Sequence, residues 1–168
     1  MPIEKLESLP DNSRVWVYAA RNEIGDERAT RLLSAVDEFL TDWSAHGTPL
    51  HSARDWRDDR FLTIAVDQTK AGASGCSIDG LFRILKGLER ELGTELITSA
   101  LVFYRDADGK VQAVTREQFE QLALAGKIDA STEVFDTSVV SLREWRARFA
   151  SRAGDSWHAA FIPGAKAT

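Results

Sequence analysis

The stretch AGASGCSIDG (residues 71–80) decides how the first half of the chain is expected to fold. It follows residues 61–66, an apolar run typical of a buried β-strand, and leads into a segment whose apolar residues recur every three or four positions. Small residues permit a tight turn between a strand and a helix. The stretch therefore predicts a strand–loop–helix unit, and Gly93 is expected to end the helix.

The segments around this unit extend the pattern. β-branched and aromatic residues at 15–19 predict a strand, and a one-sided apolar stripe over residues 26–43 predicts a helix. Further strands are expected at residues 50–56, 61–66 and 97–104. The order β-α-β-β-α-β predicts an α+β fold with a ferredoxin-like (split β-α-β) core of four strands and two helices over residues 14–104.

The second helix is expected to bury Ile78, Leu81, Phe82, Leu85 and Leu88 against the sheet, because these residues follow the helical period. Residues 105–162 are expected to form a C-terminal α/β extension packed on the core, so that the chain is one domain overall. Residues 1–13 and 163–168 are expected to be loose termini.

Composition sets aside several function classes. The 168 residues carry a net charge of −5 without a basic run, which disfavours nucleic-acid binding. No apolar stretch is long enough for a membrane span, and the first residues do not resemble a signal peptide. One cysteine excludes an internal disulfide, and no Cys/His cluster has metal-ligand spacing. We expect a soluble cytoplasmic protein with no cofactor and no metal; its oligomeric state stays open.

Cys76 is the first candidate for chemistry, because free N–H groups at a helix N-terminus stabilise a thiolate or a bound anion. The ligand-binding candidates beside it are Gly72, Ser74, Gly75, Ser77 and Asp79. The carboxylate of Asp79 would oppose a thiolate within one helical turn. The alternative is a small buried cysteine beside a structural turn. The loop matches neither a Walker A motif nor a Gly-x-Gly-x-x-Gly loop.

A thiolate nucleophile needs a base or a cation, and three histidines are candidates. In the expected fold, His46 and His51 lie at the same end of the sheet as Cys76. His158 cannot be placed by topology, and its neighbour Trp157 either lines a pocket or packs in the core. Each histidine taken alone fits a structural or solvated residue better than a catalytic one.

Residues 71–79 and DSWHA (155–159) resemble segments of a family of small uncharacterised bacterial proteins. Its members often carry the label "ABC transporter ATPase", and the resemblance extends from Val15 to Phe161. It implies no established activity, but it makes Cys76 and His158 the catalytic pair to test. The label does not fit the chain, which has neither a Walker A lysine nor a Walker B carboxylate after an apolar strand.

Two functions follow as hypotheses, and whether the protein is an enzyme stays open. The first is a ligand- or anion-binding site at residues 71–79, thiol-dependent through Cys76. The alternative is a non-catalytic interaction or scaffold module in which this loop is only a turn. The expected partner is a small anionic ligand or another protein, with no nucleic acid and no membrane.

Overall fold

The computed structural model describes residues 1–164. The chain forms two compact units, each of which is described by itself. The first contains Met1–Thr98 and the short segment Val140–Arg143; the second contains Ser99–Val139 and the described residues from Glu144 onward. In the described part of the chain, none of the helices combines the length and apolar character needed to cross a membrane.

An antiparallel three-stranded sheet forms the centre of the first unit. Strands β1 (Arg14–Ala19), β5 (Phe61–Val66) and β4 (Ser52–Arg57) lie in the order β1-β5-β4. Every residue of β5 is buried, as expected for a central strand with an apolar sequence. The residues at 15–19, 50–56 and 61–66 therefore form strands as predicted, and the last two form a hairpin.

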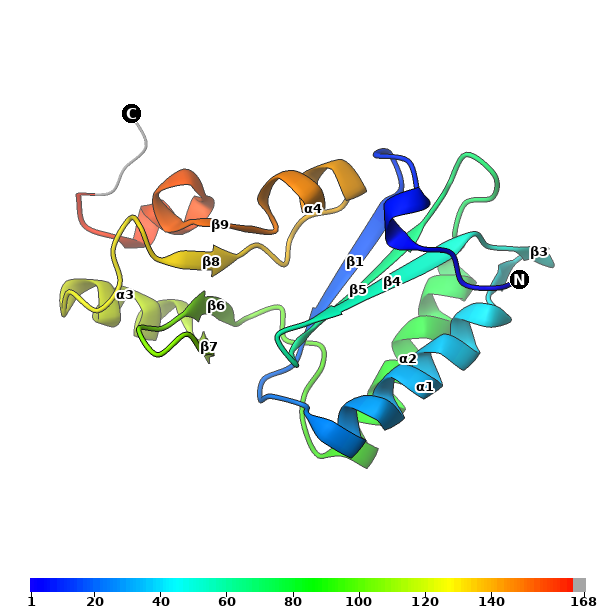
Figure 1. Cartoon of the computed structure of the whole chain (residues 1–168), viewed down its shortest axis with the longest axis horizontal. Helices are drawn as coiled ribbons and strands as arrows, with labels where there is room; N and C mark the ends of the chain where they lie inside the picture. Colours follow the sequence, from blue (N-terminus) through cyan, green and yellow to red (C-terminus); the bar gives the residue numbers. More distant parts are fainter. Residues whose placement is uncertain (165–168) are drawn as a thin grey trace. The chain divides into compact units, whose positions relative to one another are not determined.

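Helices α1 (Asp26–Thr41) and α2 (Gly75–Leu92) both cover one face of this sheet (Figure 1). Their apolar stripes and the facing strand residues form one core that includes Leu32, Leu40, Ile64, Leu81 and Leu85. A hairpin of β2 (Ser44–Ala45) and β3 (Thr48–Pro49) follows α1. Its turn residues, His46 and Gly47, both have positive φ, as type I′ turns require.

The predicted fourth strand of this sheet is absent from it. Strand β6 (Val102–Arg105) instead joins a second sheet. After Gly93, whose φ is +70°, the chain runs without a strand to residue 101. Glu89 Oε2 fixes this segment by accepting hydrogen bonds from the N–H groups of Leu96 (2.7 Å) and Ile97 (3.1 Å). The structure is thus α+β, with three of the four strands expected of a ferredoxin-like sheet.

A segment from far along the chain pairs with the outer edge of β1. The N–H of Val15 donates to the carbonyl of Val140 (3.0 Å), and Arg14 forms an isolated antiparallel bridge with Ser141. Edge strands expose unpaired backbone groups, so this short segment satisfies part of the outer edge of β1.

The second unit contains a four-stranded antiparallel sheet in the order β7-β6-β8-β9. Its other strands are β7 (Val111–Val114), β8 (Glu133–Phe135) and β9 (Ala150–Arg152). Helix α3 (Arg116–Leu124) begins at a capping box formed by Thr115 and Gln118. Helix α4 (Leu142–Arg148) precedes β9. The 3₁₀ helices η2 (Ala153–Asp155) and η3 (Trp157–Phe161) follow β9.

Two further expectations require correction. The N-terminal residues are not loose, because they contain the 3₁₀ helix η1 (Leu6–Ser8), Leu6 and Leu9 are buried, and Glu4 N–H donates to Ser52. At the other end, residues 165–168 of the expected loose segment lie outside the described residues. Within α2, two of the five predicted core residues are not fully buried: Phe82 is 44% exposed and Ile78 is half-buried, whereas Leu81, Leu85 and Leu88 are buried together with Leu92.

Candidate functional site

The polar side chains of residues 71–79 are largely committed to starting α2. Ser74 is the N-cap: its Oγ accepts from Ser77 N–H (3.2 Å), and its own N–H donates to Ser77 Oγ (2.8 Å). A Cβ added to Gly75 would meet no atom within 4 Å, and one added to Gly72 would meet only Gln68 Oε1 at 3.5 Å. A side chain would therefore fit at both positions, so crowding by surrounding atoms does not explain either glycine.

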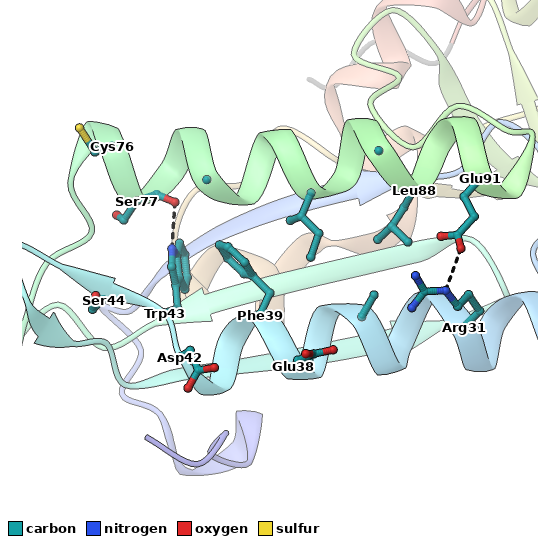
Figure 2. Close-up of a pocket in the computed structure, with 14 residues that line it drawn as sticks. Arg31, Glu38, Phe39, Asp42, Trp43, Ser44, Cys76, Ser77, Leu88 and Glu91 are labelled. Carbon is teal, nitrogen blue, oxygen red and sulfur yellow. Dashed lines mark hydrogen bonds and ion pairs between the residues drawn. The ribbon is translucent and has the colours of Figure 1, made fainter.

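Cys76 is exposed and is the second residue of α2. Figure 2 shows its side chain pointing away from α1. The first intrahelical hydrogen bond is donated by Ile78 N–H, so the N–H groups of Gly75 and Cys76 precede the helical ladder. Asp79, one turn into the helix, is also exposed. The predicted ligand-binding residues 72–79 thus lie together around the helix N-terminus.

Asp67 directly follows β5 and fixes the start of the loop that leads to α2. This residue was not among the candidates identified from the sequence. It is 5% exposed, and its Oδ1 accepts from the N–H (3.0 Å) and the hydroxyl (2.6 Å) of Thr69. The hydroxyl of Thr69 is the largest of the effects that hold the pKa of Asp67 below its usual range. An Asp-x-Thr sequence directly after an apolar strand is a recognisable Asx-turn pattern.

A groove with a volume of about 760 Å³ runs between α1 and α2 and reaches Cys76 at one end (Figure 2). Its apolar lining comes from Ala35, Phe39, Trp43, Ile84 and Leu88, and polar or charged side chains line the rest. The Phe39 and Trp43 rings are 5.7 Å apart, and Trp43 Nε1 donates to the carbonyl of Ser77 (2.8 Å). That hydrogen bond holds the end of α1 against the start of α2.

Carboxylates dominate the charged groups that line the groove. At one end Arg31 Nε pairs with Glu91 Oε1 (3.0 Å). Glu38, in the last turn of α1, and Asp42, its C-cap residue, have no side-chain partner among residues 1–164. The last turn of α1 contains no basic side chain, although the carbonyl of Thr41 accepts a hydrogen bond from the amino group of Met1. Carboxylates at a helix C-terminus oppose the helix dipole, so a cation bound here would be stabilised.

Two glycines make room for the groove. Gly80 and Gly87 lie on the face of α2 that lines it. A Cβ at Gly87 would meet nothing within 4 Å, and one at Gly80 would make ordinary contact with Phe39 at 3.5 Å. Alanine would therefore fit at both positions and would favour the helix by roughly 0.5–1 kcal/mol per residue. The glycines leave open space at a cost in helix stability.

The three histidines have separate surroundings, and none of them lines the groove. His46 is exposed in the β2–β3 turn. His51 is half-buried, and its Nδ1 lies 2.7 Å from Glu4 Oε1. His158 belongs to the second unit, whereas Cys76 belongs to the first. The proposed pairing of Cys76 with His158 therefore stays a prediction.

His158 is fully buried in an aromatic environment. Its ring stacks on Trp157 at 3.7 Å and lies 5.8 Å from Phe119. Its Nδ1 contacts Ser156 Oγ, while Nε2 is buried without a hydrogen-bond partner. Burial lowers the pKa of His158 to about 4, against the opposing effect of Asp136. A neutral, enclosed imidazole of this kind fits a structural role better than a general base at neutral pH.

Trp157, the other predicted site residue near the C-terminus, is 39% exposed. The guanidinium of Arg116 lies 5.7 Å from the centre of its ring, and Phe161 contacts the ring edge. Trp157 is thus both a packing residue for His158 and a partly accessible aromatic surface.

No group of three or more His, Cys, Asp or Glu side chains in residues 1–164 could hold a metal ion. No protein-family model, curated protein or solved structure matches the chain. The site must therefore be judged on its own chemistry. An apolar groove with unpaired carboxylates can bind an amphipathic cation, whereas the exposed thiol lacks a neighbouring histidine or lysine in the lining of the groove.

Proposed function

We propose that the protein is a non-catalytic binding module whose ligand lies in the groove between α1 and α2. The observation that carries this proposal is the pair of glycines, Gly80 and Gly87, on the groove face of α2. Local features that reduce stability without serving the fold are often found at functional sites. Here the two glycines lower the stability of α2 and enlarge an apolar groove, and concave apolar surfaces of this kind are typical of binding sites.

The lining indicates the chemistry of the ligand. Phe39, Ile84 and Leu88 would contact an apolar body, and Glu38 and Asp42 would attract a cationic group. This charge argues for a cation in the groove itself, rather than for the small anion expected from residues 71–79. The proposed ligand is therefore an amphipathic cation.

Replacing Gly87 by Leu should separate binding from stability. Leucine favours the helix and fills the groove, so the free energy of unfolding should rise by about 0.5–1 kcal/mol. Affinity for thioflavin T, an aromatic cation whose fluorescence rises when it is immobilised, should fall at least tenfold. Fluorescence titration and urea unfolding measure the two effects.

Matched variants test this interpretation. Thr30→Leu introduces the same side chain at an exposed position of α1 outside the groove and should leave dye affinity unchanged. The double variant Glu38→Gln/Asp42→Asn should weaken binding and reduce its dependence on salt. The proposal fails if the wild-type protein shows no saturable binding, or if Gly87→Leu binds the dye as tightly as the wild type does.

A thiol-dependent anion site is the second candidate, favoured by the exposure of Cys76 beside the leading N–H groups of α2. If it is correct, iodoacetamide should alkylate Cys76 in the folded protein about tenfold faster than it alkylates glutathione at pH 7. Asp79→Asn should accelerate the reaction, because the carboxylate opposes the thiolate. A rate equal to that of glutathione, unchanged by Asp79→Asn, would leave this site without support.

A further inference from the structure

The second unit has a pocket of its own, remote in sequence from the groove residues. It has a volume of about 670 Å³ and lies where α3 meets the β6–β7 hairpin. Its apolar lining comes from Ala113, Val114, Leu122 and Ala125. This volume is within the range of sites that hold small molecules.

Tyr104 is the residue that marks this pocket as more than a packing gap. It lines the pocket and is only 9% exposed, yet its hydroxyl has no hydrogen-bond partner in residues 1–164. The hydroxyl oxygen is not one of the fully buried polar atoms that lack a partner, so it is accessible although most of the ring is buried. Because Tyr104 lines the pocket, this accessible hydroxyl is available to hydrogen-bond a molecule bound there.

The sheet and helix hold the Tyr104 ring in place. Tyr104 pairs with Gln112 of β7 and Val134 of β8, and its ring meets Phe119 of α3 edge-on at 6.1 Å. Burial raises the pKa of Tyr104, and Asp106 raises it further, so the hydroxyl keeps its proton at neutral pH and can donate it in a hydrogen bond.

The polar residues around the pocket are Glu117, Gln118, Gln121 and Lys127. One carboxylate and one ammonium leave no net charge among these side chains. Gln118 is already committed, because its Oε1 accepts from Thr115 N–H. The fixed polar feature of the pocket is thus a neutral hydrogen-bond donor.

We propose that this pocket binds a small apolar molecule with one hydrogen-bond-accepting group, which receives a hydrogen bond from the hydroxyl of Tyr104. The apolar part contacts Val114, Leu122 and the two alanines. A neutral carbonyl and a carboxylate share this acceptor chemistry, and Lys127 would additionally favour the carboxylate. The site is independent of the groove proposed above.

The test uses the full chain and two probes of equal length, 2-nonanone and nonanoate, followed by two-dimensional amide NMR. Saturable shifts should appear at Ala113, Val114, Leu122 and Ala125 and should exclude the α1–α2 groove. Binding of the ketone alone or of both probes identifies the acceptor group as sufficient; binding of nonanoate alone identifies the carboxylate as the ligand group. Absence of saturable shifts at these residues with either probe overturns the proposal.

Tyr104→Phe removes the hydroxyl and leaves the ring, so affinity should fall roughly three- to tenfold, as expected for one hydrogen bond. The chain offers a matched control, because its only other tyrosine, Tyr18, is in the first unit. Tyr18→Phe should leave affinity unchanged. Equal affinities of wild-type protein and Tyr104→Phe would show that the hydroxyl does not contact the ligand, and would overturn its proposed role.

Discussion

Acidification from pH 6.5 to pH 4 should destabilise the protein by about 3 kcal/mol through His158 alone. The physical reason is the enclosed position of the imidazole between Trp157 and Phe119, where burial disfavours the charged form and Asp136 opposes that effect only in part. Because the folded-state pKa is about 4 and the unfolded value is about 6.5, the unfolded chain binds the proton more tightly.

The sign and pH window follow from these two values. The stability associated with neutral His158 is complete above pH 6.5, declines as the pH falls, and stops declining below about pH 4. Urea unfolding across this range should show the decline in the wild type, and His158→Gln should remove it. His46→Gln, at an exposed turn, should retain it.

Carboxylates also titrate near pH 4, but they do so in all three proteins, so the difference between wild type and His158→Gln isolates the imidazole. If His158→Gln fails to fold, the ring proton resonances of His158 in the wild type give its pKa directly by NMR. A measured pKa near 6.5 would contradict the structural interpretation of this residue.

Elements with a strong local pattern were predictable. The strands at 15–19 and 61–66, helix α2, its end at Gly93 and the capping box at Thr115 all depend on residues within a few positions of each other. Strand pairing is different, because the residues of 102–105 specify a buried strand but not its neighbour. The expected place of this strand in the first sheet was wrong for this reason, and Val140 and Ser141 lie at the outer edge of β1.

The candidate site was predictable only in part. The position of Cys76 at the start of a helix followed from the small residues before it. The groove was missed, because Gly80 and Gly87 appear in the sequence only as weak helix formers and Phe39 and Trp43 as core residues. A groove depends on what two separate helices leave unfilled, and no local pattern records that. Two glycines seven positions apart on one face of a predicted helix were the available signal.

Leu85→Ala should lower the free energy of unfolding by about 2–5 kcal/mol. Leu85 is fully buried in the core formed by α1, α2 and the β1-β5-β4 sheet, so its truncation removes apolar contacts and leaves a cavity that the antiparallel sheet cannot easily fill. Urea unfolding of the full chain measures the change, with the denaturant slope m checked for constancy.

Phe82→Ala is the informative comparison, because Phe82 is in the same helix and is the larger side chain. It is 44% exposed, and the ammonium of Lys86 lies over its ring, 5.6 Å from the ring centre. Its truncation should cost about 1 kcal/mol or less, since partly exposed side chains lose little burial and leave no closed cavity. If the two variants lose equal free energy of unfolding, Phe82 is as buried in solution as Leu85, and the face of α2 that packs on the sheet is not the one seen in the structure. A larger loss at Leu85 would place the core-facing stripe of α2 at Leu81, Leu85, Leu88 and Leu92. Side chains on the opposite face could then be replaced with little loss of folding stability.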